Sequence, residues 1–568
     1  MELMESPIMP QEGSFSEEPY AQQPQRQQHH APFRTLDEFL QRAADEALHN
    51  RQQNRRPWPY WWMFLSLGVA NSSDATEILC LSFLLADETF QEDMLKSSFN
   101  NSHNSAGNLA AAVFLGMLLG GLLVGTAGDV WGRRPVLLTG CAVNATAGIL
   151  ASITTHVVIL TTCRFVAGVG IGATVPPLFT LCSELAPPAQ RGFWVAVVAS
   201  FWMVGSLFVA AVGYCVFTLA SNGTFLFGLT SWRLFLFLCA LPSLVGGLLV
   251  ARHVPESPRF LALHGQYARA VQVVQSLGTK LGISTATFTP IGPPWSLTEA
   301  RAQFPPSTRT INPHHVPTSF SSMWKTACLE LYRSTRLVYT KHLWGPMLGL
   351  QIVWASLSFG SYGLTTWINS IFTQVHLHDV YFNAFLFALS NLPGNLLSAY
   401  LLDTWGRTTM LTGSLLAASA SLAVFGYAAS AMSQSPHRDF YIVSAACAFQ
   451  AFTIAAWNTI DVWTAEVFPT AVRSTALGLC AATGRLAAMA AQIVNGALIA
   501  QPARLLVTSA VSLAVGAFVP CCWISDWTGR SVLDQVEDST SESRDGHDTE
   551  EESREFLPSP DHPVNDYH

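Results

Sequence analysis

Five charged residues stand inside long apolar stretches of the sequence, where ionised side chains are rare. They are Asp74, Glu77, Arg164, Asp461 and Arg485. Each costs at least roughly 2.5–3.5 kcal/mol near the centre of a bilayer on insertion scales, so such residues usually face a water-filled cavity or pair with one another. Intramembrane acids also carry protons in pumps and transporters. These residues therefore predict a polar solute pathway in which at least one acid exchanges a proton.

Spacing places these charges on helix faces. Asp74 and Glu77 are three residues apart and share one face, about 14 residues or ~20 Å into their apolar segment. Trp457 and Asp461, four residues apart, present an aromatic ring and a carboxylate on one face of another segment. A structural alternative stays open for each: Asp74 and Glu77 could pair with Arg485, and Asp461 could make a helix–helix hydrogen bond.

The elements that position these residues are apolar runs of about 20 residues, the length of a membrane-spanning helix. Half of the 568 residues are hydrophobic and only 12% are charged, which favours a membrane protein over a soluble one. Twelve runs are found, near 60–85, 107–127, 136–154, 157–182, 194–219, 233–251, 344–371, 380–402, 409–432, 440–464, 475–499 and 503–524. The sequence predicts an all-α membrane protein with twelve transmembrane helices in two pseudo-symmetric six-helix bundles.

The domain organisation follows from these runs. We expect a cytosolic N-terminal tail (1–56), an N-terminal six-helix bundle (57–254), a cytosolic central loop (255–342), a C-terminal bundle (343–525) and an acidic disordered tail (526–568). The formal net charge is −8, but the last segment holds 13 acids against three arginines, so the acidity belongs to the tail. Thr35 and Glu38 form a capping box that predicts a short amphipathic helix bearing Leu36, Phe39 and Leu40 on one face.

Basic residues predict the orientation. Lysines and arginines concentrate in alternate connections, which the positive-inside rule places in the cytosol together with both termini. Two N-x-S/T sequons, at Asn100 and Asn222, then fall in outside loops where glycosylation is possible. We expect these two sites alone to be modified, because the sequons at Asn71 and Asn144 lie inside spans.

Two short motifs occur once in each half, in the same order, which indicates an internal duplication. One lies between spans 2 and 3 and again between spans 8 and 9; the other follows spans 4 and 10. Their residues are Gly125, Asp129, Gly132, Arg133, Arg134, Glu184 and Arg191 in the first half, and Asp403, Arg407, Glu466 and Arg473 in the second. We expect the acids and arginines to form a gating charge network that changes as one bundle rocks against the other.

The duplicated motifs resemble those of the major facilitator superfamily. Arg164-Phe-Val-Ala-Gly168 and Pro255-Glu-Ser-Pro-Arg259 match further signatures of that superfamily. Trp232-Arg233, Tyr362-Gly-Leu-Thr and Trp457-Asn-Thr-Ile-Asp461 resemble the synaptic vesicle glycoprotein 2 family. Only residues 372–379 are available where that family carries a large luminal domain, so the chain is most similar to the shorter synaptic vesicle 2-related proteins. Ser525-Asp-Trp-Thr-Gly-Arg530 departs from the sugar-porter motif after span 12 and argues against a hexose.

The resemblance implies a central cavity that adds Trp202 and Tyr362 to Asp74, Glu77, Trp457, Asp461 and Arg485. It implies a secondary active transporter that moves a small polar organic solute by alternating access, and the intramembrane acids allow coupling to protons. The alternative is a non-transporting vesicle membrane protein, a trafficking regulator or receptor that keeps the fold.

Other function classes lack support in the sequence. No P-loop, nucleophile elbow or metal-ligand cluster is recognised, so we expect no enzyme, no cofactor and no metal. No basic soluble domain suggests nucleic-acid binding. We expect a monomer in a vesicle, endomembrane or plasma membrane, with the bilayer and a small solute as its partners and with cytosolic tails that could bind trafficking proteins.

Overall fold

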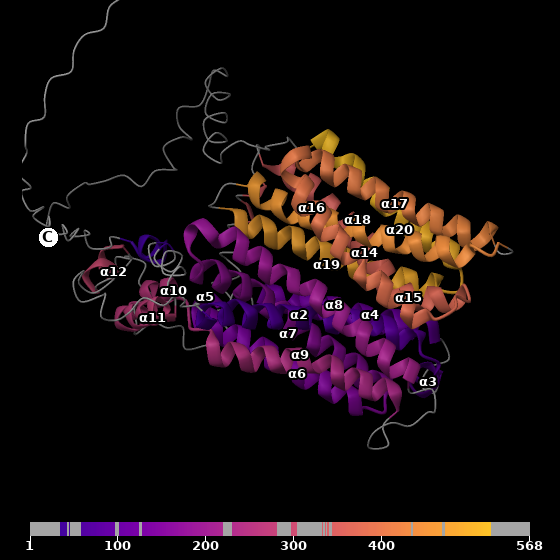
Figure 1. The fold of residues 1–568 in the computed structure, drawn as a ribbon, viewed down its shortest axis with the longest axis horizontal. Helices are drawn as coiled ribbons and strands as arrows, with labels where there is room; N and C mark the ends of the chain where they lie inside the picture. The colour runs from indigo at the N-terminus through magenta and orange to yellow at the C-terminus, as the bar shows by residue number, and fades with distance from the viewer. Residues whose placement is uncertain are drawn as a thin grey trace, which may run out of the picture.

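The computed structural model describes residues 35–41, 45, 58–96, 102–123, 128–219, 230–280, 297–303, 332, 335–336, 338–339, 343–432, 435–468 and 472–523. Every regular element within these ranges is a helix. The long helices form two groups that lie side by side with their axes roughly parallel (Figure 1).

The first group comes from the N-terminal half of the chain. It comprises α2 (Trp58–Ala86), α4 (Ser102–Leu123), α6 (Arg133–Ile153), α7 (Val157–Leu185), α8 (Arg191–Leu219) and α9 (Ser231–His253). The short helices α3 (Glu88–Phe90), η2 (Gln91–Lys96) and α5 (Gly128–Trp131) lie between its members. These helices confirm the six predicted segments of the first half, with ends that differ by a few residues.

The second group repeats this plan. It comprises α14 (Trp344–Gln374), α15 (Val380–Leu389) with α16 (Asn391–Trp405), α17 (Arg407–Ala431), α18 (Arg438–Val467), α19 (Arg473–Leu498) and α20 (Pro502–Trp523). A turn at Ser390 divides the eighth span into α15 and α16. The two groups meet where α4 packs against α19, α2 against α14 and α8 against α15. The predicted twelve-helix arrangement in two bundles is thereby confirmed.

Two of the twelve helices lack an 18-residue stretch as apolar as those of the other ten. Ten of the helices among the described residues are long and apolar enough to cross a membrane, and α2 and α14 are not among them. Both are nevertheless long, with 29 and 31 residues. Each packs against several other helices, including the other one of the pair, so it touches little lipid and can carry polar side chains. These two central helices supply several of the residues considered below.

Short helices gather at one end of the bundles, which we call the α11 end; the opposite end, near α3, is the α3 end (Figure 1). The α11 end holds α10 (Pro258–Leu263), α11 (Tyr267–Lys280) and α12 (Leu297–Gln303). Residues 36–41 form a further helix there, and the backbone N–H of Glu38 donates to Oγ1 of Thr35 at 3.2 Å. Leu36, Phe39 and Leu40 are buried in one apolar cluster with residues of α7 and α11. The predicted amphipathic helix is confirmed.

Candidate functional site

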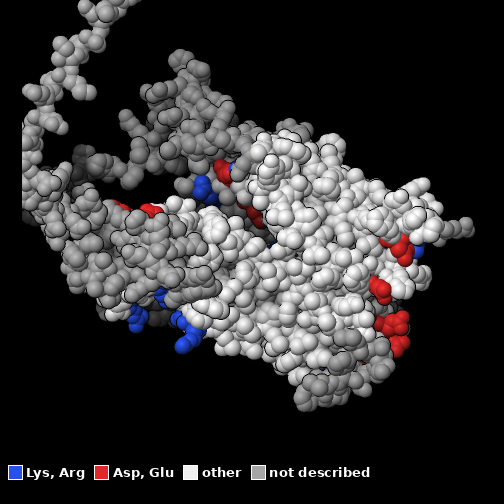
Figure 2. Space-filling model, in the orientation of Figure 1, with Lys and Arg blue, Asp and Glu red and all other residues white. Residues whose placement is uncertain are grey.

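A hollow between the two halves contains charged side chains (Figure 2). Asp461 of α18 is exposed, although protein surrounds it deep among the long helices. An exposed carboxylate at such a depth requires a water-filled recess, because ionised groups are not tolerated in an apolar interior without water or a partner. Asp461 therefore faces a solvent-filled space inside the protein rather than a helix contact.

Tyr362 of α14 joins the aromatic residues beside this hollow. Its ring centroid lies 5.5 Å from that of Trp457 and 5.4 Å from that of Phe114 on α4. The guanidinium of Arg485 on α19 lies 5.6 Å from the same ring centre, a cation–π distance. Trp457 is fixed by its indole N–H, which donates to Ser361 Oγ at 3.2 Å. The structure thus brings together three of the predicted cavity residues and adds Phe114.

Arg485 links acids from both halves. It interacts electrostatically with Asp461 of the second half and with Asp74 of the first. Asp74 is buried, and its Oδ1 accepts a hydrogen bond from Thr174 Oγ1 at 3.4 Å. The second carboxylate oxygen, Oδ2, has no hydrogen-bond partner among the described residues, and neither has Nη1 of Arg485. Arg485 therefore interacts with one carboxylate of each half, and the carboxylate of Asp74 keeps one oxygen without a partner among the described residues.

Glu77 has a different environment from Asp74. Its carboxylate forms an ion pair with Arg164 of α7, and both side chains are almost fully buried, at 2% and 1% exposure. Arg164 also donates to the backbone oxygen of Glu77 and lies 3.2 Å from Sγ of Cys80. On the other side Glu77 meets α6 so closely that a methyl group on Gly148 would collide with it. Glu77 lies in a packed contact between helices of the first half, and its partner is Arg164 rather than Arg485.

Trp202 of α8 lies at the edge of an apolar cluster. The cluster is built from Ile78, Val113, Phe114, Met117, Ile171 and Ala488, and Trp202, Tyr362 and Met489 pack against it. Because its members come from helices of both halves, this cluster forms part of the contact between them. Trp202 is half-buried there and packs against the same cluster as Tyr362.

The motif residues of the first half meet at the α11 end. Arg133 forms an ion pair with Glu184 at 3.8 Å. The backbone N–H groups of Arg133 and Arg134 donate to the carboxylate of Glu256, which satisfies the start of α6. Gly132 has a φ of +105°, and a side chain there would collide with Glu256. Glu256 was not among the sequence candidates, although it lies inside the quoted Pro-Glu-Ser-Pro-Arg run.

The second half repeats this ion pair. Nε and Nη2 of Arg407 each donate to an oxygen of Glu466 at 3.1 Å. Arg473 Nε donates to the backbone oxygen of Phe468 at 3.3 Å, just as Arg191 donates to Ser183 at 2.9 Å in the first half. Neither ion pair crosses between the halves: Arg133 and Glu184 both belong to the first half, and Arg407 and Glu466 both belong to the second. Gly125 and the side chains of Asp129 and Asp403 lie outside the described residues, as do the sequons at Asn100 and Asn222.

Asp37 of the N-terminal helix makes a contact that the motifs did not predict. Its carboxylate accepts from Arg191 at 2.6 Å and also from Arg259. The backbone N–H of Leu36 donates to Gln303 of α12 at 3.0 Å, which attaches the same helix on its other side. A capping box predicts where a helix begins, but it does not indicate what that helix packs against.

The α3 end is closed by close packing of the two halves. The ring of Tyr381, on α15, stacks between Phe83 of α2 and Phe217 of α8, with centroids 6.2 and 5.0 Å away. Gly107 and Gly496 let α4 and α19 meet, because a methyl group on Gly107 would lie 3.1 Å from the backbone oxygen of Gln492. The hollow is therefore shut toward the α3 end.

Comparison with known proteins agrees with this architecture. Residues 81–491 match the Major Facilitator Superfamily. The human synaptic vesicle glycoprotein 2B is 26% identical over 77% of this chain and 78% of that protein, and the rat synaptic vesicle glycoprotein 2A is 25% identical over 76% and 72%. An inward-open structure of the xylose transporter XylE from E. coli superposes with a TM-score of 0.62 and 16% identity, covering 84% of this chain and 98% of that one. XylE is a proton:xylose symporter.

Proposed function

Because the chain belongs to the major facilitator superfamily, we propose that it is a secondary active transporter that moves a small polar organic solute by alternating access. The α11 end is its cytosolic end, since the basic connections lie there. The hollow that reaches Asp461 then opens to the cytosol while the α3 end is closed, which is an inward-facing state. The chain is a multi-pass protein of a vesicle membrane, which the synaptic vesicle relatives favour over another endomembrane or the plasma membrane.

The observation that carries this proposal is the placement of one cation between acids of the two halves. If all three groups are ionised, Asp74, Asp461 and Arg485 sum to −1, so the site attracts a cation or a proton more readily than an anion. Trp457 and Tyr362 beside them offer aromatic faces, which bind cations and apolar groups alike. The solute class that fits is a small organic cation or a polar molecule with a cationic group.

Coupling follows from the same arrangement. When the halves rock apart, the distances from Arg485 to Asp74 and Asp461 change by different amounts, because the two acids belong to different halves. A proton or cationic solute on one acid then alters the relative free energies of the inward- and outward-facing states. XylE, which shares the fold, is likewise a proton:xylose symporter.

Uptake into proteoliposomes that contain the full chain tests the function. The solutes are small organic cations, neutral sugars and carboxylates, each measured with and without a pH gradient. We expect cation uptake driven by the gradient, and we expect Asp461→Asn to reduce that uptake at least tenfold. Asp439→Asn is the matched control, because Asp439 lies in the same helix at the α3 end, far from the hollow.

No accumulation of any solute under either condition would refute transport. The same result would favour the alternative function, a vesicle membrane protein that keeps the transporter fold without moving a solute. An equal loss of uptake in Asp461→Asn and Asp439→Asn would show that the hollow does not carry the coupling.

A further inference from the structure

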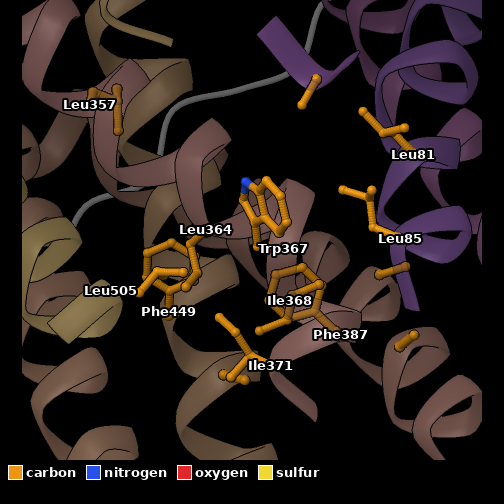
Figure 3. Close-up of a cluster of buried hydrophobic side chains, with 14 of the residues drawn as sticks. Leu81, Leu85, Leu357, Leu364, Trp367, Ile368, Ile371, Phe387, Phe449 and Leu505 are labelled. Carbon is orange, nitrogen blue, oxygen red and sulfur yellow. The ribbon is translucent and has the colours of Figure 1, made fainter. Parts of the chain in front are cut away.

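A second cavity lies nearer the α3 end than the charged hollow. It is lined by residues of α2, α8, α14, α15, α16 and α18, so helices of both halves enclose it. Ile368 and Phe387, which lie next to each other in Figure 3, form part of its apolar wall. Phe83 also lines the cavity, and the stack of Phe83, Tyr381 and Phe217 separates it from the α3 end.

The polar groups of this cavity are uncharged and incompletely bonded. Asn369 on α14 is 1% exposed, and neither Oδ1 nor Nδ2 has a hydrogen-bond partner among the described residues. Ser82 Oγ on α2 and Oε1 of Gln450 on α18 are equally without partners there. A buried donor or acceptor left unpaired costs about 1–3 kcal/mol, so three such side chains around one cavity require an explanation.

Other amides of the cavity are fixed in place. Nδ2 of Asn391 donates to Ser206 Oγ at 2.9 Å, and Oδ1 of Asn391 accepts from Nε2 of Gln450 at 2.7 Å. These bonds connect α8 to α16 and α18, and they orient Gln450 so that only its Oε1 is left unpaired. The cavity therefore presents oriented donors and acceptors from three helices, and its lining contains no charged residue.

We propose that this cavity is a second binding site, for a small uncharged molecule that both donates and accepts hydrogen bonds, such as a primary amide or a polyol. The amide of Asn369 would bond the ligand through both of its atoms, and Ser82 and Gln450 would complete the set. A charged ligand is excluded, because no opposite charge offsets its desolvation. The site is distinct from the charged hollow and does not depend on transport.

The present state of the molecule holds this site contracted. The cavity measures about 30 Å³, which accommodates about two water molecules. Ser82 belongs to the first half, whereas Asn369 and Gln450 belong to the second. The site therefore widens when the halves part at the α3 end, and a ligand bound there favours the wider state.

Thermal unfolding of the purified full chain tests this proposal, with acetamide and xylitol as neutral probes. Acetate, which has nearly the shape of acetamide but carries a charge, is the control ligand. We expect acetamide to raise the midpoint of unfolding in a saturable manner and acetate to leave it unchanged. Asn369→Leu should abolish the shift, and Ser82→Ala should weaken binding roughly fivefold, as for one lost hydrogen bond.

Asn495→Leu is the matched control variant. Asn495 of α19 is also fully buried with both amide atoms unpartnered, but it does not line the cavity. It should keep the wild-type response, as should Asp461→Asn in the charged hollow. The proposal fails if wild type shows no saturable shift, if Asn369→Leu responds like Asn495→Leu, or if Asp461→Asn abolishes the response. Should Asn369→Leu not fold, Ser82→Ala alone decides. Failure of solute uptake leaves this result unaffected, so the two proposals are separable.

Discussion

The ion pair between Glu77 and Arg164 predicts that neutralisation destabilises the protein far more at Glu77 than at Asp74, the other acid of the same helix. Both members of the pair are at most 2% exposed, and no water can replace a lost partner. Removing one charge of a buried pair costs about 3–5 kcal/mol, because the other charge stays buried and uncompensated. We therefore expect Glu77→Gln to destabilise the folded protein by that amount.

Asp74 lies one turn earlier in α2 and has no such partner. Its Oδ2 is unbonded, and its bonds from Thr174 and Ser73 are long, at 3.4 and 3.5 Å. Asn in its place keeps an acceptor for Thr174 and removes a charge that forms no ion pair within 4 Å among the described residues. We expect Asp74→Asn to change stability by less than about 1 kcal/mol while it removes pH-driven uptake.

The assay is thermal unfolding of the purified protein, read together with the yield of folded protein. Glu77→Gln and Arg164→Gln should each lower the midpoint of unfolding, and the double variant should recover most of the loss, since no unpaired charge is left. The double-mutant cycle should give a coupling energy at least as large as the loss in one single variant, about 3–5 kcal/mol. A Glu77→Gln protein as stable as wild type, or a double variant no better than the singles, would refute the reasoning.

Three further predictions concern the two ends of the molecule. Gly107→Val should hold the α3 end apart, because the added side chain meets the backbone of Gln492; a thiol in Tyr381→Cys should then react several-fold faster with an impermeant maleimide. Asp37→Asn removes two half-exposed ion pairs, worth about 1 kcal/mol, so hydrogen exchange over residues 36–41 should accelerate about fivefold. Burial raises the pKa of the Glu256 carboxyl above its usual value of 4.5, so the folded protein favours the protonated carboxyl. The stability that this group contributes is present at low pH and is lost as the pH rises through the raised pKa. Glu256→Gln should therefore flatten the dependence of the unfolding free energy on pH in that range.

Hydrophobicity in the sequence was enough to predict the helices, because lipid demands apolar runs of nearly constant length. The central helices α2 and α14 were found by this means even though they are shielded from lipid, because apolar residues stand on both sides of their polar ones. Spacing along one helix also grouped Trp457 with Asp461 correctly, because i,i+4 neighbours share a face in any helix.

Contacts between helices could not be predicted in the same way. Asp74 and Glu77 share a face by their spacing, yet one meets Arg485 and the other Arg164. The choice depends on which helices pack beside α2, and a single sequence contains no such information. The unpaired amide of Asn369 was missed for a related reason, since buried and exposed asparagines look alike in an apolar segment.

The contact of Asp37 with Arg191 and Arg259 also bears on how the protein is best produced. Polar residues before a first span are often deleted to obtain a compact membrane protein. A truncation that begins at Trp58 would remove the helix at 36–41, expose the apolar surface that Leu36, Phe39 and Leu40 cover, and leave two arginines without their shared acid. Fusion partners and affinity tags are therefore better placed at the C-terminal end, and the N-terminal helix belongs to the smallest fragment worth purifying.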